Sequence, residues 1–396
     1  MTVRPETNST AERRARVHQS GSAWTDRGTR HLAGGDWVAS AGCHKRAVAL
    51  LGSLPVAENP AYLADLGAAW VNLGCALRAG RSPDSLGAFD RAVALLGQLP
   101  YGDNPRFGHN LAAAWMNRAD ALAHANTEDG RAGALLAYAR AIEIAGALPL
   151  DEKASFRILL ASCWINLGAL HQRLLEASAA VQAYDRAIDA LGCLPAFGHR
   201  MACHHAATAW TNRGETLLAG HSADSAKPAL ESGRNALAIV EGKNLDPLAA
   251  AKLSLRALRV MARSHEVLLR SGASRGADSL AALTDIAERG LELAFEGRGS
   301  EPEFFDPFIA WFFSFGSRTY GQHQPQFLAE FLEELLLRAD SAGGPGLAAG
   351  LRAVARQAAA GALEGLGRSR ILIAGTPQAN LLMATVSDLP HAAKQL

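Results

Sequence analysis

The sequence predicts an all-α fold in which tandem helix pairs stack as a solenoid. Five related stretches each open with a tryptophan, and successive tryptophans lie 45 to 49 residues apart. Between them the apolar residues recur at helical spacing, without the alternation typical of strands. Neither helix of a pair can bury its apolar stripe alone, so consecutive pairs must stack on one another. The tryptophans are Trp24, Trp70, Trp115, Trp164 and Trp210.

The first helix of each unit carries the tryptophan. In the second unit it is expected over residues 60–80, because the apolar residues there fall on one helical face. Those residues are Leu66, Trp70, Leu73 and Leu77. The small residue four positions after the tryptophan, Gly74 in this unit, is expected to let the partner helix approach closely.

The second helix carries an aromatic residue three positions before an alanine, and in the second unit it is expected over residues 82–100. A Leu-Pro pair ends it, because proline cannot continue a helix and disfavours helical geometry in the residue before it. The aromatic and alanine pairs are Phe89 with Ala92, Tyr138 with Ala141 and Tyr184 with Ala187, with His44 and Ala47 in the first unit. The closing pairs are Leu54-Pro55, Leu99-Pro100, Leu148-Pro149 and Leu194-Pro195.

These motifs resemble the tetratricopeptide repeat family, whose helix pairs carry Trp-x-x-Leu-Gly, then aromatic-x-x-Ala, then a closing proline. The resemblance covers residues 10–270. The period is longer than the usual roughly 34 residues, as in the long repeats of kinesin light chains. Arginine replaces the family's leucine in alternate units, at Arg27, Arg118 and Arg213.

The predicted organisation has three parts. Residues 1–9 form a flexible N-terminus, and residues 10–296 form the solenoid of five clear repeats and one degenerate repeat. In the degenerate repeat Val260 replaces the tryptophan, and residues 279–295 form the second helix. Residues 297–396 form a mostly helical region, interpreted as a cap on the solenoid or as a docking surface.

The C-terminal region is rich in phenylalanine, which predicts a local core around Trp311. Its aromatic residues also suit a partner-docking surface, because such residues are enriched at interfaces. Beyond them the sequence predicts helices over residues 324–339 and 347–367, a break at 343–346 and a short extended segment at 371–375.

A polar column two positions after each tryptophan is the main functional clue. At 100° per residue these positions lie about 200° from the tryptophan face, which places them along the concave wall. An amide offers an acceptor oxygen and donor hydrogens, which suits the backbone of an extended peptide. The resemblance implies peptide binding too, since related repeat proteins carry an asparagine ladder. Alternatively, asparagine is only tolerated at exposed helical sites. The column is Asp26, Asn72, Asn117, Asn166 and Asn212.

Further polar positions recur in alternate units. Histidines lie six positions before the tryptophan, and are interpreted as groove-lining contacts or as ordinary surface histidines; they are His18, His109 and His204. Asp120 and Glu215 lie two positions after Arg118 and Arg213, which suits ion pairs between units or selectivity in the groove. An arginine column in the second helices is interpreted as a solvated face or an acidic-partner surface: Arg46, Arg91, Arg140 and Arg186.

The composition limits the classes of partner that the sequence suggests. Lys plus Arg total 39 against 38 Asp plus Glu, so the sequence gives no indication of nucleic-acid binding. The N-terminal sequence is polar and no stretch reaches the roughly 20 apolar residues of a membrane span, so we expect a cytoplasmic protein without a membrane partner. The five cysteines are expected to be free thiols, most of them buried.

No catalytic or cofactor motif is found in the sequence. The one group with metal-ligand chemistry, His199, Cys203, His204 and His205, presents at most a partial site, so neither a metal nor a cofactor is expected. We therefore expect a protein that is not an enzyme and that binds an extended peptide segment of a partner protein as a scaffold or adaptor. The alternative is a peptide- or ligand-sensing regulator whose C-terminal region transmits the response. The sequence does not indicate the oligomeric state.

Overall fold

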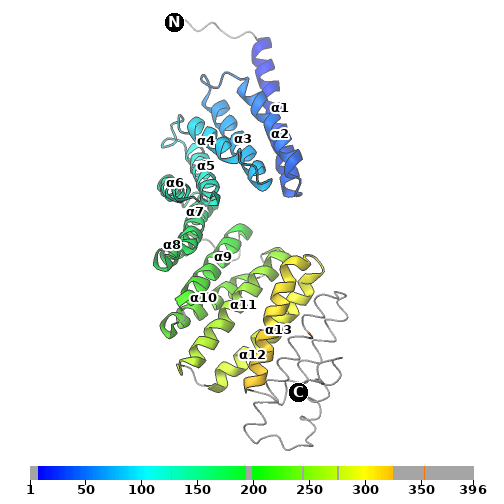
Figure 1. Cartoon of the computed structure of the whole chain (residues 1–396). Helices are drawn as coiled ribbons and strands as arrows, with labels where there is room; N and C mark the ends of the chain where they lie inside the picture. Colours follow the sequence, from blue (N-terminus) through cyan, green and yellow to red (C-terminus); the bar gives the residue numbers. More distant parts are fainter. Residues whose placement is uncertain are drawn as a thin grey trace, which may run out of the picture. The chain divides into compact units, whose positions relative to one another are not determined.

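The computed structural model describes residues 8–125, 127–192, 199–220, 222–242, 245–273, 276–323 and 352, and these residues form helices and turns without a strand. The chain divides into two compact units, Met1–Pro195 and Ala196–Leu396, whose helices are labelled in Figure 1. The predicted all-α fold of tandem helix pairs is therefore confirmed for the part of the chain that is described.

The first unit consists of four helix pairs. Within each pair the two helices pack along each other, and each first helix also contacts the first helix of the next pair. The first helices are α1 (Asn8–Ala33), α3 (Pro60–Ala79), α5 (Pro105–His124) and α7 (Ala154–Arg173). The second helices are α2 (Trp37–Gly52), α4 (Ser85–Leu96), α6 (Glu128–Gly146) and α8 (Ala177–Leu191). This arrangement creates an inner row of first helices, α1, α3, α5 and α7.

Local sequence signals explain where these helices begin and end. The side chain of Asn59 accepts a hydrogen bond from the backbone N–H of Ala61, and Pro60 supplies the fixed φ of the first helical position. Asn104 and Pro105 start α5 in the same way. At the other end of each pair the leucine of the Leu-Pro motif is buried, as Leu54 and Leu99 show, while the proline turns the chain. The second helix of the second unit ends at Leu96, earlier than the expected residue 100.

Small residues in the first helices allow the close packing that the sequence predicts. A Cβ atom at Gly74 would lie 2.5 Å from the ring of Phe89, and one at Gly168 would lie 2.7 Å from the ring of Tyr184. Both rings are almost completely buried. The aromatic residue of each second helix therefore sits directly over a small residue of its own first helix.

His44 occupies this aromatic position in the first pair. The imidazole is fully buried against Gly28, and neither ring nitrogen has a hydrogen-bond partner. Burial lowers the pKa of His44 below its ordinary value of 6.5, because the charged form loses its hydration. The imidazole is thus a poorer occupant of the site than the phenylalanine of the next pair.

We expect His44→Phe to stabilise the first unit by about 1–3 kcal/mol, the cost of a buried polar group without a partner. The gain should widen as the pH falls below 6.5, because the unfolded chain then takes up a proton that the folded chain resists. Urea denaturation of both proteins at pH 7 and at pH 5 measures the effect. Equal stability of wild type and variant at pH 5 would contradict this explanation.

The second unit continues the pattern. Its helices are α9 (Arg200–Leu217), the 3-10 turn η1 (Leu218–Gly220), α10 (Ala223–Glu241), α11 (Pro247–Arg270), α12 (Gly276–Arg298) and α13 (Pro302–His323). Helices α11 and α12 cover the residues expected as the degenerate repeat, and they contact each other. Val260 is buried there, and its side chain lies where a Cβ atom at Gly214 would point.

Helix α13 packs on α12 through its aromatic residues. Phe305 lies against Gly297 and Phe312 lies against Gly290, at distances that leave no room for a Cβ atom on either glycine. Trp311 stacks on Phe315 with the ring planes 8° apart. The predicted local core is confirmed for this helix, since five of its phenylalanines are buried. The elements expected at 324–339, 343–346, 347–367 and 371–375 lie outside the described residues. Of the N-terminus expected to be flexible over residues 1–9, residues 1–7 also lie outside them, whereas residues 8 and 9 begin α1.

The described cysteines carry free thiols. Cys43, Cys163 and Cys203 are buried, whereas Cys75 is half-buried; Cys193 lies outside the described residues. Among the helices that the structure describes, none combines the length and the apolar character needed to cross a membrane.

Candidate functional site

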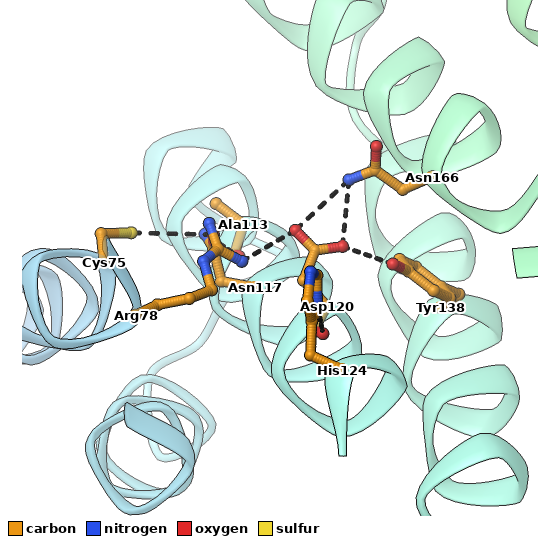
Figure 2. A network of polar contacts seen from close by, with 8 residues as sticks. All are labelled: Cys75, Arg78, Ala113, Asn117, Asp120, His124, Tyr138 and Asn166. Atoms are coloured by element: carbon orange, nitrogen blue, oxygen red, sulfur yellow. Dashed lines mark hydrogen bonds and ion pairs between the residues drawn. The ribbon is translucent and has the colours of Figure 1, made fainter. Parts of the chain in front are cut away.

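A polar network between the first helices of the first unit is centred on Asp120. Its carboxylate accepts hydrogen bonds from Arg78 of α3 at 2.9 Å, from the Tyr138 hydroxyl of α6, and from Asn166 of α7 at 3.1 Å. Figure 2 shows the carboxylate between Arg78 on one side and Tyr138 and Asn166 on the other. Only 16% of its side chain is exposed. Asp120 therefore joins three consecutive repeats.

Asn117, one turn earlier on α5, makes three side-chain hydrogen bonds. Its Oδ1 accepts from Arg78 at 3.1 Å and from the Cys75 thiol at 3.7 Å, while its Nδ2 donates to the carbonyl of Ala113 at 2.9 Å. The residue is 8% exposed. This amide holds adjacent repeats together, and it has little capacity left for a ligand.

The network balances one cation against one anion. Burial, together with the charge of Asp120, raises the pKa of Tyr138 above its usual value of 10, so the phenol stays protonated and donates. Burial likewise raises the pKa of the Cys75 thiol. The Arg78–Asp120 ion pair is thus flanked by neutral donors, which is a stable arrangement for a largely buried carboxylate.

A second network lies nearer the N-terminal ends of the same helices. The carboxylate of Asp65 on α3 is 2.7 Å from Nε2 of His18 on α1 and 2.8 Å from the guanidinium of Arg106 on α5. Of the predicted histidines, His18 is thereby placed in an inter-repeat contact. Asp65 joins three repeats in the same manner as Asp120.

The second unit repeats this design with different residues. Arg256 of α11 donates to Oδ1 of Asn212 at 2.6 Å and to Glu215 at 2.8 Å, both on α9. Arg259 also reaches Glu215, at 3.2 Å. Asn212 and Glu215, predicted as ligand contacts, are thus brought together by an arginine of the next repeat.

The structure leaves the other predicted residues apart from these networks. Asp26 is exposed on α1, and Asn72 is half-buried on α3 without a hydrogen bond to its side chain from any described residue. His109 packs against Phe156 with ring centroids 5.7 Å apart, and burial lowers its pKa. His204 lies beside His205 at 5.8 Å; burial lowers the pKa of both histidines, that of His205 to about 4.

Sequence reasoning missed the residues that complete the networks. One signal was available for Tyr138, because a buried tyrosine hydroxyl requires a hydrogen-bond partner. No comparable pattern marks the charged partners, which differ in position from one repeat to the next. They are Arg78, Asp65, Arg106, Arg256 and Arg259.

The tryptophans are half-buried, and most are covered by arginines. Arg46 lies over Trp24 at 4.6 Å and Arg91 over Trp70 at 5.9 Å, so these two members of the second-helix arginine column make cation–π contacts from an exposed face. Arg118 covers the ring of Trp115, and it also forms the expected ion pair between units, with Asp90 at 2.6 Å. The arginine is favourable there because the face of the indole ring attracts its guanidinium.

Metal-binding groups are not assembled in the part of the chain that is described. No set of three or more His, Cys, Asp or Glu side chains among those residues is arranged to hold a metal ion. His199 sits at the N-terminal boundary of α9, and Cys203 is buried within that helix.

Comparisons with known proteins give only distant likenesses. No protein-family model and no curated protein matches the sequence. Among solved structures, BtubC (BKLC) from P. vanneervenii is 15% identical, with 66% of this chain and 92% of that chain covered at a TM-score of 0.49. The apo form of RapI is 12% identical, covering 73% and 94% at a TM-score of 0.44. The S. pombe nuclear import adaptor Nro1 is 12% identical, covering 89% and 99% at 0.39.

These TM-scores are below 0.5, so the likenesses indicate no function for this chain. The fold rests on the helix pairs themselves, which carry the tryptophan, the small residue, the aromatic residue and the closing proline in register. With that signature in consecutive packed helix pairs, the chain has an all-α fold of tandem, tetratricopeptide-like helix pairs.

Proposed function

We propose that this chain is a non-catalytic adaptor that binds an extended segment of a partner protein along the inner row, α1, α3, α5 and α7. The polar column predicted from the sequence follows this row. The observation that supports the proposal is that the asparagines of successive first helices differ in their hydrogen bonds. The Oδ1 of Asn117 already accepts two hydrogen bonds, whereas the Oδ1 atoms of Asn72 and Asn166 accept none from the described residues.

Asn166 is oriented by the network without being consumed by it. Its Nδ2 donates to Asp120, which fixes the side chain and leaves its Oδ1 without a partner among the described residues (Figure 2). Asn72 lies on α3, two positions before α7 in the inner row, and both its donor and its acceptor are available. A carbonyl oxygen held in one orientation can accept a peptide N–H with little further loss of side-chain entropy.

Such amides recognise a peptide backbone whatever its side chains are, because every residue except proline offers one N–H and one C=O. Ordering a flexible segment offsets much of the contact energy. We therefore expect affinities on the order of micromolar, with selectivity supplied by the side chains that surround the amides.

The test replaces both amides, Asn72→Ala with Asn166→Ala, and compares partner capture from a cell extract with that of wild type. We expect the variant to lose partners that wild type retains, because two backbone contacts of roughly 1 kcal/mol each disappear. Photo-crosslinkers at the two positions should then attach to the same partners.

The matched control is Asn117→Ala, which removes a structural amide. It should lower the unfolding temperature while the captured proteins stay the same at temperatures where it is folded. Retention of every partner by the double variant, with unchanged helicity by circular dichroism, would contradict binding along the inner row.

A further inference from the structure

The outer side of the first unit, away from the inner row, has an open groove between α2 and α4. This outer groove encloses about 500 Å³, within the range of natural ligand pockets. Its floor is apolar and belongs to α3, where Trp70, Leu73 and Leu77 lie in line. Lys45 of α2 and Arg91 of α4 flank it. The inner-row proposal uses none of these residues.

The equivalent surface one repeat later is closed by an ion pair. Arg118 holds there the position that Leu73 holds here, three residues after the tryptophan, and Asp90 holds the position of Lys45, two residues before the alanine. Arg118 pairs with Asp90 at 2.6 Å and covers Trp115. With leucine and lysine at these positions, no such bridge forms over Trp70.

On the α4 side, the outer groove is lined by a residue without a side chain. Gly87 lines the groove, and a Cβ atom added there would meet no atom within 4 Å. The next repeat has Leu136 at the corresponding position, five before the alanine. Gly87 lies in the first turn of α4, and it keeps space open beside Leu73.

The charges indicate what would fill this space. Neither Lys45 nor Arg91 has an acidic partner among the described residues, and Arg91 lies over Trp70 at one end of the groove. Asp84 is the N-cap residue of α4, at the opposite end. At 1.5 Å per residue it lies about 10 Å along the helix from Arg91. Beyond that end Trp37 of α2 lies over Gly80 and is 48% exposed, which extends the apolar surface.

We propose that the outer groove binds a peptide segment of a partner protein in which acidic residues adjoin large apolar residues. The carboxylates pair with Lys45 and Arg91, and an apolar side chain enters the space beside Gly87, over Leu73 and Leu77. This is a second interaction surface, independent of the inner row, and it recognises side chains where the inner row recognises backbone.

The test uses the full chain and a set of fluorescein-labelled dodecapeptides in which a Glu-Glu pair precedes a Leu-Phe pair at every spacing from none to four serines. Each has a counterpart with lysines in place of the glutamates. Fluorescence polarisation should show at least one acidic peptide binding better than its counterpart, with affinity falling as salt rises. Gly87→Phe should weaken this binding by about tenfold or more.

Two control variants separate filling of the groove from other effects. Gly87→Ala keeps the groove open, and Gly42→Phe adds the same ring on the exposed face of α2, where a Cβ atom also meets nothing within 4 Å. Both should bind like wild type. The paired change Lys45→Asp with Leu73→Arg copies the Arg118–Asp90 bridge and should also abolish binding; if it does not fold, Gly87→Phe decides alone.

Three results would overturn the proposal. The first is that no acidic peptide binds better than its lysine counterpart, and the second is equal binding by wild type and Gly87→Phe. The third is concentration-dependent self-association in sedimentation that Gly87→Phe abolishes while the acidic peptides do not compete, because the occupant would then be a second copy of this chain.

Discussion

Asp120→Ala is expected to destabilise the first unit by about 3 kcal/mol, the lower end of the range for removing one partner of a buried ion pair. The lower end applies because part of Arg78 is in contact with solvent. The substitution removes the acceptor of Arg78, Tyr138 and Asn166 together, leaving a buried hydroxyl and a charge without their partners. Urea denaturation followed by tryptophan fluorescence measures the loss.

The matched control is Asp90→Ala, which breaks an ion pair between the same two repeats at a more exposed position. It should cost at most about 1 kcal/mol, as surface pairs do. Tyr138→Phe combined with Asp120→Ala should be less damaging than the sum of the single changes, because the orphaned hydroxyl is gone. Equal losses for Asp120→Ala and Asp90→Ala would show that the network does not hold the repeats together.

Gly74→Leu is expected to cost about 3 kcal/mol, at the upper end for overpacking a buried site. Even the Cβ atom would lie 2.5 Å from the Phe89 ring, and that ring is fully buried and cannot swing into solvent. The α3 and α4 helices must therefore separate. The unfolding free energy and the near-ultraviolet circular dichroism of the aromatic residues should both fall.

Gly42→Leu serves as the control for this change, because it adds the same side chain to a helix where nothing lies within 4 Å of the new Cβ atom. Leucine is the better helix former, so this variant should gain up to about 1 kcal/mol. Phe89→Ala in the Gly74→Leu background should recover part of the loss by returning the space. A Gly74→Leu protein as stable as wild type would rule out close packing as the role of this glycine.

The fold follows from the sequence because its signals are local and repeated. Tryptophan, glycine, aromatic residue and proline recur in step, and each acts within its own helix pair, as the contact between Gly74 and Phe89 illustrates. The helix starts follow equally local rules, such as the cap at Asn59. Periodicity did not predict that the tryptophans would be only half-buried, because the cover comes from arginines such as Arg46.

The networks were harder to foresee, because they depend on which side chain of one repeat reaches the next. Asn117 lies on α5, and the angular position of a residue on its own helix cannot show that Arg78 of the preceding repeat occupies its oxygen. The arginine that donates to Asp120 comes from the preceding repeat, whereas the arginine that donates to Glu215 comes from the following repeat. Spacing alone contains no information on that choice.

The alternation between leucine and arginine after the tryptophan has a consequence for how this array can change its length. Leu73 leaves its outer surface open, and Arg118 one repeat later bridges to Asp90. The position six residues before the tryptophan alternates in the same way, because it is a histidine at His18 and His109 but not in the repeat between them. The building block is therefore a couplet of helix pairs, and excision of one pair would set unlike edges against each other. Excision of a whole couplet would rejoin matching edges. A functional array should therefore lengthen and shorten by an even number of helix pairs.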